Sequence, residues 1–400
     1  MRAVTPRILA AAAALALGLG AAPGAAPADP LRLRADALAS TASPAGLLVL
    51  EAGGALQPGL SAEAVVWLSG ARTPGEDTTG DVLVIAVRGA TRSGRLGVRA
   101  GRFVSALGAL RPAHVDGGAL RIRLPRRFDV EAVAGIPVEP VAGMARSLDW
   151  LAGGRIARRI GDGGSVGLAY AQRRDEGRLA LEELGADAGL ALTARHDLGA
   201  RAAYDLANPG LAELALTASY RRRGVRAEAY AIHRAASHLL PATSRFSVLG
   251  DVPSQRAGTV VTWRAAPRLD VIGELGGRRI GDDLGAELVA RARLRLDDRG
   301  TSVLAGELRR SGAGDDAWTG ARGTARIALP RSFTVSAELE LVYPDADHRR
   351  GAVWPWGLAA VSWERGGWQA AVAIEALASP EYRHRVDAIG RLGRRWGSPR

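Results

Sequence analysis

The segment Gly163–Gly167 is the stretch of the chain that most closely matches a catalytic motif, because it reads G-x-S-x-G around Ser165. That motif places a nucleophilic serine on a sharp turn between a strand and a helix, with a histidine partner from later in the chain. The residues that follow, Leu168, Tyr170 and Gln172, alternate as in a strand, which favours a glycine-rich hairpin turn instead. We therefore expect no enzyme, and a barrel hydrolase based on Ser165 is kept only as an alternative.

Two residue types are missing from the chain. It contains no cysteine and no lysine, so its 53 basic residues are all arginine. This excludes a P-loop lysine, a Schiff-base lysine, a thiolate zinc site and a disulfide framework. The six histidines stand at no metal-binding spacing, and four of them, His114, His196, His238 and His348, lie in or near expected connections, where histidine is usually solvated. We expect neither a metal nor another cofactor.

Arginine is the residue type that follows a pattern. In several segments arginines occupy alternate positions opposite an apolar set, and acidic residues follow the same alternation elsewhere. Charged side chains on one face can line a water-filled passage and attract anions, or they can pair with each other across neighbouring strands. The candidate residues are Arg32, Arg34, Arg121, Arg123, Asp129, Glu131, Glu287, Arg291, Arg293, Arg295, Glu338, Glu340, Arg383 and Arg385.

The elements that must position these residues are strands. From Leu284 to Leu296 one alternate set is entirely apolar and the other carries the charged residues, and the segment from Phe333 to Tyr343 repeats the pattern. A helix cannot segregate residues at period two, whereas a strand with two different faces does so. After the first 28 residues no apolar run approaches the ~20 residues that a membrane helix needs. The chain is therefore expected to be all-β.

The number and spacing of the strands favour a closed transmembrane barrel. The alternating segments give about 22 antiparallel strands, with roughly 16–22 as the plausible range. Tight connections such as 364–367 and 330–332 alternate with longer ones such as 344–351 and 311–317, as in outer-membrane barrels. A soluble β-sandwich or solenoid is the alternative, but the apolar face is rich in alanine, glycine and leucine, and no fixed short repeat occurs. Aromatic residues near strand ends fit the two girdles of a membrane barrel, among them Tyr204, Tyr220, Trp263, Trp318, Tyr343, Trp354, Trp363, Trp368 and Trp396.

Residues 1–28 have the features of a secretory signal peptide. Arg2 and Arg7 precede a short apolar run, and small residues ending at Ala28 provide a cleavage site. Its removal takes away two arginines and no acidic residue, which lowers the net charge from +12 to +10. An exported chain does not meet cytoplasmic nucleic acid, so we expect no nucleic-acid partner. Residues 29–400 are expected to form the barrel without a plug domain, because strand alternation starts directly after the cleavage site.

Three short segments carry a resemblance to porin-type channels. Arg99–Phe103, Val115–Ala119 and Arg121–Leu124 resemble their strand–loop–strand units, and the last strand ends in Trp396. With the signal peptide and the alternating strands, the chain is similar to the outer-membrane β-barrel proteins of Gram-negative bacteria. The resemblance implies an outer-membrane location, insertion by the barrel-insertion machinery, contact with outer-membrane lipid and lipopolysaccharide, and a channel for small solutes. One departure is that family members usually end on the aromatic residue, whereas Gly397–Arg400 follow it here.

In a membrane barrel the charged face of each strand must point into the lumen. The apolar face must meet lipid, because a charge there costs about 2–4 kcal/mol at the bilayer midplane. The fourteen charged residues named above are therefore predicted to line a pore. An arginine excess would favour anions, whereas pairing of arginine with carboxylate across strands would neutralise the wall, and the sequence leaves both open.

A barrel of about 22 strands is normally filled, whereas one of 16–18 strands leaves a channel. The segment 237–255 is too apolar for a freely solvated loop. We predict that it folds into the lumen as a constriction, with Leu239, Leu240, Phe246 and Leu249 as its apolar residues.

The sequence predicts a porin-like outer-membrane channel for passive diffusion of small solutes, with anions preferred if the arginine excess sets the field. The alternative is a non-conducting barrel that anchors or assembles a cell-surface complex. The solute, the partner proteins and the oligomeric state do not follow from the sequence.

Overall fold

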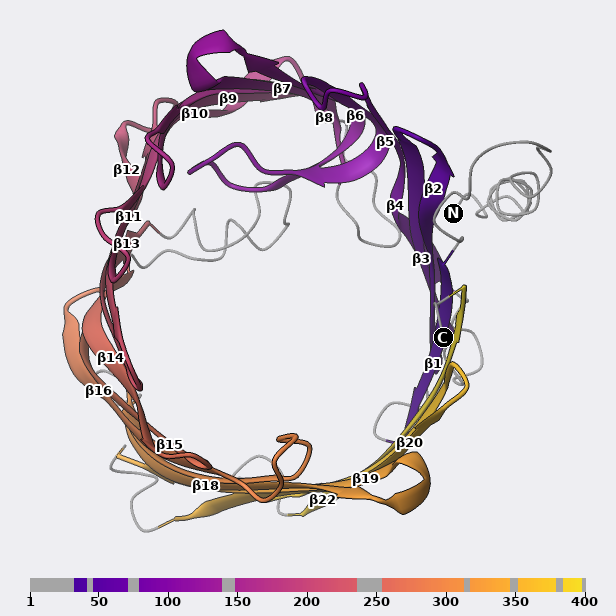
Figure 1. The fold of residues 1–400 in the computed structure, drawn as a ribbon, viewed down its shortest axis with the longest axis vertical. Coiled ribbons are helices and arrows are strands. Elements are labelled where there is room, and N and C mark those ends of the chain that lie inside the picture. Colours follow the sequence, from indigo (N-terminus) through magenta and orange to yellow (C-terminus); the bar gives the residue numbers. More distant parts are fainter. Residues whose placement is uncertain are drawn as a thin grey trace.

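Period-two alternation produces strands throughout the part of the chain that the computed structural model describes. These strands form one antiparallel sheet of 22 strands, and β1 pairs with β22 to close it into a barrel (Figure 1). The described residues are 32–41, 46–70, 79–138, 148–235, 254–312, 317–345, 352–378 and 384–397. Within them, no helix has the length and apolar character that crossing a bilayer requires. The prediction of an all-β barrel of about 22 strands is confirmed.

The strands follow each other around the barrel in chain order, and each pairs with the next. They are 9 to 14 residues long, which suits a tilted membrane-spanning strand. Their bounds are β1 (Arg32–Ser40), β2 (Gly46–Gln57), β3 (Leu60–Gly70), β4 (Thr79–Ala90), β5 (Leu96–Ser105), β6 (Ala113–Leu124), β7 (Phe128–Pro137), β8 (Leu148–Ile160), β9 (Gly164–Asp175), β10 (Arg178–Ala191), β11 (His196–Asp205), β12 (Gly210–Arg222), β13 (Val225–Arg234), β14 (Ser254–Ala266), β15 (Leu269–Ile280), β16 (Asp283–Arg295), β17 (Val303–Ser311), β18 (Trp318–Leu329), β19 (Phe333–Pro344), β20 (Trp354–Arg365), β21 (Trp368–Leu377) and β22 (Arg385–Trp396).

The two ends of the barrel differ in their connections. At one end, which we call the short-turn end, every connection between strands is two to seven residues long: 58–59, 91–95, 125–127, 161–163, 192–195, 223–224, 267–268, 296–302, 330–332 and 366–367. The opposite, long-loop end holds all the connections longer than seven residues, 71–78, 138–147, 235–253 and 345–353, together with shorter ones such as 176–177, 206–209 and 281–282. Outer-membrane barrels place their short turns in the periplasm.

The outward-facing residues of the strands are mostly apolar, and many of the large ones are exposed. Leu275, Leu284 and Val386 are 66%, 77% and 68% exposed, which suits a hydrocarbon surround rather than water. Outward aromatic residues gather at the short-turn end (Phe128, Tyr220, Trp263, Phe333, Trp363, Trp368 and Trp396) and at the long-loop end (Trp150, Tyr204 and Tyr343).

Two aromatic residues depart from the expected girdles. Trp318 and Trp354 pair with Ser311 and Val342, which belong to the inward-facing sets of β17 and β19. Both tryptophans therefore face the lumen and do not belong to the outer girdles, because the register of β18 and β20 turns them into the barrel.

The wall bends inward at a row of glycines. Gly101, Gly117 and Gly135 pair directly with one another across β5, β6 and β7. A Cβ atom on Gly117 would lie 2.1 Å from the carbonyl oxygen of Ala134 and 2.5 Å from the Cα of Gly135, so a side chain does not fit there. Beyond this row the ends of β5 and β6, in violet, lie inside the ring (Figure 1). We call residues 102–116 the inner hairpin.

Candidate functional site: the charged lumen and its inner hairpin

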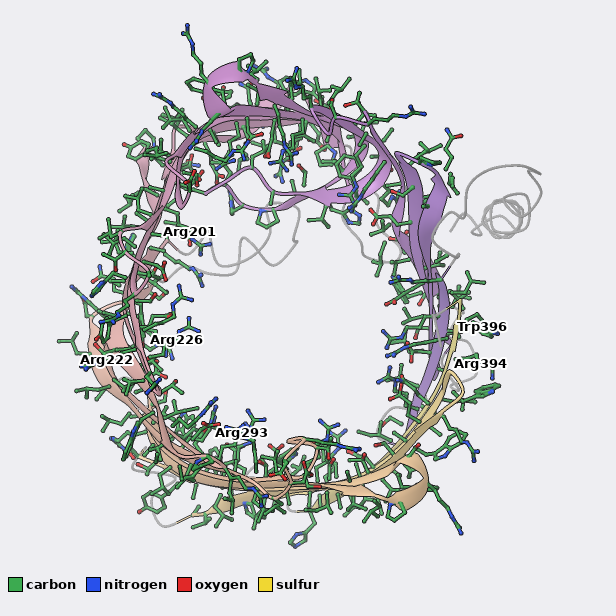
Figure 2. All side chains as sticks on the ribbon, viewed as in Figure 1. Arg201, Arg222, Arg226, Arg293, Arg394 and Trp396 are labelled. Atoms are coloured by element: carbon green, nitrogen blue, oxygen red, sulfur yellow. The ribbon has the colours of Figure 1, made fainter. Side chains whose placement is uncertain are left out.

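The register assigns the inner face of every strand. Figure 2 shows Arg201, Arg226 and Arg293 directed into the lumen and Arg222 and Arg394 directed outward. Directly paired residues lie on the same face of the sheet, and successive residues of a strand alternate between the two faces. The labelled arginines therefore determine which residues of every other strand face the lumen. The predicted residues that lie on the inner face are Arg32, Arg34, Arg121, Arg123, Asp129, Glu131, Glu287, Arg291, Arg293, Arg295, Glu338, Glu340 and Arg385.

The fourteenth predicted residue, Arg383, lies outside the described residues. That the other thirteen line a conducting pore stays a prediction, since the register gives the face on which they lie and not what passes between them.

Cross-strand ion pairs link most inward carboxylates to arginines. Arg322 lies 2.6 Å from Glu338, and Arg256 contacts both Glu274 and Glu287. Pairs of the same kind join Arg291 to Glu307, Arg309 to Glu340, Arg201 to Glu213 and Arg295 to Asp270. Opposite charges facing each other across strands stabilise the wall and cancel much of its field.

A second group of charges is uncompensated. Five inward arginines have no carboxylate at ion-pair distance among the described residues: Arg32, Arg178, Arg278, Arg293 and Arg326. The turns of the short-turn end carry nine arginines, Arg92, Arg95, Arg126, Arg127, Arg195, Arg223, Arg268, Arg299 and Arg331, against three acidic residues, Asp162, Asp297 and Asp298. Two of these arginines are paired, Arg127 with Asp162 and Arg268 with Asp298, so a net positive charge remains. The positive excess of the described barrel is therefore concentrated around the short-turn mouth.

The tip of the inner hairpin packs against the inner wall of β8 to β10. Leu107 lies over Gly153, and Leu110 lies over Gly185, where a Cβ atom would come within 2.8 Å of each leucine. The side chains that pack here form the main buried apolar cluster among the described residues, which includes Phe103, Leu107, Leu110, Val115, Val133 and Leu151. Glycine in the wall thus provides the space that the hairpin fills.

One ion pair holds the tip in place, and a second lies in the wall beneath it. Arg111 of the hairpin lies 2.6 Å from Glu183 of β10, and their side chains are 8% and 1% exposed. Next to it, Arg155 binds Asp187 through two hydrogen bonds of 3.0 and 2.6 Å, directly beneath Gly108 of the tip. A buried charge requires a partner, so the Arg111–Glu183 pair ties the hairpin to one position on the wall.

The inward bend interrupts the wall beside β4. Pairing between β4 and β5 stops at Ile85 and Arg102, so residues 79–84 have no β5 partner. The side chain of Arg102 replaces one of the missing backbone hydrogen bonds, because its guanidinium donates to the carbonyl oxygen of Val82 at 3.0 Å. The same guanidinium donates to the carboxylate of Asp116 at 2.7 and 2.8 Å.

His114 also contributes to this junction. It hydrogen-bonds the backbone of Leu83, and it is only 6% exposed. The expectation of a solvated connection histidine is wrong for His114, because the hairpin folds inward and buries it against β4. His196 is exposed on the outer face at the start of β11, where its ring centre lies 5.0 Å from that of Tyr220, and its solvation stays a prediction.

The predicted constriction residues Leu239, Leu240, Phe246 and Leu249 lie outside the described residues. The inner hairpin, which the sequence did not single out, is the element that enters the lumen in the described part of the chain. Two features of the sequence are consistent with this hairpin. Apolar Leu107 and Leu110 lie within a connection, and glycines stand at positions that pair with one another across β5, β6 and β7.

The candidate catalytic serine does not sit on an elbow. The tight turn 161–163 precedes it, Ser165 is the second residue of β9, and strand pairing continues through Gly167. The hairpin interpretation of this segment is confirmed. The described residues contain no group of three or more histidine, aspartate or glutamate side chains arranged to hold a metal ion.

Comparisons with known proteins identify the fold. No protein-family model matches the sequence, and no curated protein matches it. Among solved structures, the siderophore receptor PirA from Pseudomonas aeruginosa superposes with a TM-score of 0.61 at 8% identity, over 93% of this chain and 81% of PirA. The copper transporter OprC gives 0.56 at 10% identity, over 94% and 82% of the two chains.

An assembly intermediate of the E. coli P pilus that contains PapC gives a TM-score of 0.52 at 11% identity, and it covers 94% of this chain but 62% of the other. At such identities the similarity shows the fold alone. The fold is that of the outer-membrane β-barrels of Gram-negative bacteria, which the sequence resemblance implied.

Proposed function

We propose that this outer-membrane β-barrel is a channel for the passive diffusion of small anionic solutes. The observation that carries the proposal is the arginine excess at the short-turn mouth, where nine turn arginines meet three acidic residues. A mouth lined by one sign of charge raises the local concentration of the opposite ion and lowers that of its own sign.

The two interpretations that the sequence left open act together in this proposal. Paired residues such as Arg322 and Glu338 contribute little net field and stabilise the wall. Arginines without such partners, including Arg278, Arg293 and Arg326, then determine the sign of the field in the lumen. Selectivity thus depends on a few residues, although the lining carries many charges.

The inner hairpin is proposed as the size filter. A barrel of 22 strands encloses a lumen far wider than a small solute, and such barrels are typically filled. The hairpin occupies part of that lumen and is held there by Arg111 and Glu183. It therefore narrows the passage on the side of β8 to β10.

Planar-bilayer recording in a potassium chloride gradient tests the proposal. We expect ohmic steps whose reversal potential has the sign of a chloride-preferring channel. The triple variant Arg278→Gln, Arg293→Gln and Arg326→Gln is expected to shift the reversal potential towards zero, because it removes only uncompensated charge.

The matched control removes a pair instead. The double variant Arg322→Gln and Glu338→Gln changes no net charge, so its reversal potential should equal that of the parent protein. A barrel that inserts but passes no current would contradict the channel and favour the non-conducting alternative. Current with a cation preference would contradict only the anionic part of the proposal.

A further inference from the structure

A cluster of arginine and tryptophan lies on the outer face at the short-turn end, over β20 to β22. Trp368 is the first residue of β21, and it pairs directly with Arg365 on one side and Arg394 on the other. Trp396 is two residues from Arg394 on the same face, and Figure 2 shows both directed away from the lumen. The cluster therefore presents two positive charges beside two large aromatic rings.

The geometry of Arg394 indicates a preformed site. Its guanidinium carbon lies 4.4 Å from the ring centre of Trp368 and 5.7 Å from that of Trp396, so the two rings hold it in position. Its Nε atom is buried and has no hydrogen-bond partner among the described residues. Neither Arg394 nor Arg365 has a carboxylate at ion-pair distance in the described part of the chain.

Two outward arginines at the opposite end have carboxylate partners within the protein. At the long-loop end Arg310 is paired with Asp345, and Arg279 with Asp282. Arg174, which is also outward at that end, donates to the carbonyl oxygen of Gly177. The arginines of the cluster differ from Arg310 and Arg279 in having no carboxylate partner among the described residues.

An unpaired charge beside the apolar band needs an anion from its surroundings. Tryptophan girdles mark the depth of the lipid headgroups, and that is the depth at which Arg365 and Arg394 lie. We propose that Arg365, Trp368, Arg394 and Trp396 form a binding site for the phosphate of an anionic glycerophospholipid in the leaflet at the short-turn end. The two guanidinium groups bind the phosphate, and the tryptophan rings contact the glycerol and upper acyl chain. This site is independent of whether the barrel conducts.

Native mass spectrometry of the full-length folded barrel in detergent tests the site. Phosphatidylglycerol or phosphatidylcholine is added separately, and the dissociation constant of the first bound lipid is measured. We expect the parent protein to prefer phosphatidylglycerol. In the double variant Arg365→Gln and Arg394→Gln this preference should fall by about fivefold for each arginine removed.

The control removes equal charge from the opposite face of the same end. Arg264 and Arg395 are inward, and the double variant Arg264→Gln and Arg395→Gln should keep the parent preference. Heat-modifiable gel migration shows that each variant is folded. Trp368→Leu, which keeps both charges and removes the stacking platform, provides a second variant and should also weaken binding of phosphatidylglycerol.

Two results would overturn the proposal. One is a parent protein that binds both lipids equally. The other is an equal loss of preference in the inward control, which would show that the charge of the whole rim attracts the lipid rather than this cluster. Conductance does not enter either result, so failure of the channel proposal leaves this one standing, and the reverse also holds.

Discussion

Single glycines decide where this barrel departs from a plain cylinder. At Gly101, Gly117 and Gly135 three strand backbones approach closely, and β5 and β6 turn into the lumen beyond them. Gly153 and Gly185 leave space in the wall for the side chains of the two hairpin leucines. Other glycines in the strands, such as Gly189, have open space around them. The same residue type therefore has a structural role at some positions and none at others.

Replacing Gly117 with alanine should displace the inner hairpin. The new Cβ atom would meet backbone atoms of β7 at 2.1 and 2.5 Å, which a side-chain rotation cannot relieve. We expect a loss of about 1–3 kcal/mol in hairpin packing, seen as larger single-channel conductance or faster proteolysis at the tip. Gly189→Ala, where nothing lies within 4 Å, is the matched control and should behave as the parent protein. Equal behaviour of the two variants would show that the glycine row does not shape the bend.

At the scale of elements, the inner hairpin depends on contacts with strands that follow it in the chain. Its connection to β10 rests on Arg111 and Glu183, which are almost fully buried. The alternation of single strands carries no information about such contacts, because it gives the two faces of each strand and not the path of a connection. This is why the sequence predicted the strands and did not single out the inner hairpin.

Replacing Glu183 with glutamine should release the tip of the hairpin. The substitution leaves Arg111 buried beside a neutral group, and breaking a buried pair in this way costs about 3–5 kcal/mol. Increased conductance together with new protease sensitivity near residues 106–112 is the expected result. Glu364→Gln is a suitable control, because Glu364 is exposed and its nearest arginine contact, Arg395, is at 3.7 Å. Unchanged conductance and protection in Glu183→Gln would mean that apolar packing alone fixes the tip.

At the scale of the whole molecule, closure of the barrel joins the first described strand to the last. Asp36 of β1 lies 2.5 Å from Arg34 and 2.7 Å from Arg391 of β22, so one carboxylate bridges the closing pair of strands. The arginine ladder of β22 was visible in the sequence, and the count of about 22 strands followed from alternation. The closing register could not be predicted, since it depends on which residues of two distant strands face each other.

Replacing Asp36 with asparagine should weaken this closure. The neutral amide cannot balance two arginines, and a hydrogen bond to a charged group contributes about 1.5–3 kcal/mol. We expect the temperature at which the folded band disappears in heat-modifiable gels to fall. Glu228→Gln, which affects a pair within β13 alone, should change it little. If the folded band of both variants disappears at the same temperature as that of the parent protein, the backbone hydrogen bonds between β1 and β22 close the barrel without a contribution from this carboxylate.

The docking of the inner hairpin also constrains the order in which the molecule assembles. Arg111 and Glu183 are 72 residues apart, and the surface that receives the tip consists of β8 to β10, which follow the hairpin in the chain. Contacts between distant segments form late, because the intervening chain must first be ordered. The hairpin therefore cannot dock until β8 to β10 have joined the sheet, and Leu107 and Leu110 stay exposed until then. Docking of the hairpin is therefore a late step in folding. The time at which residues 106–112 become protected from protease would show when this half of the barrel is complete.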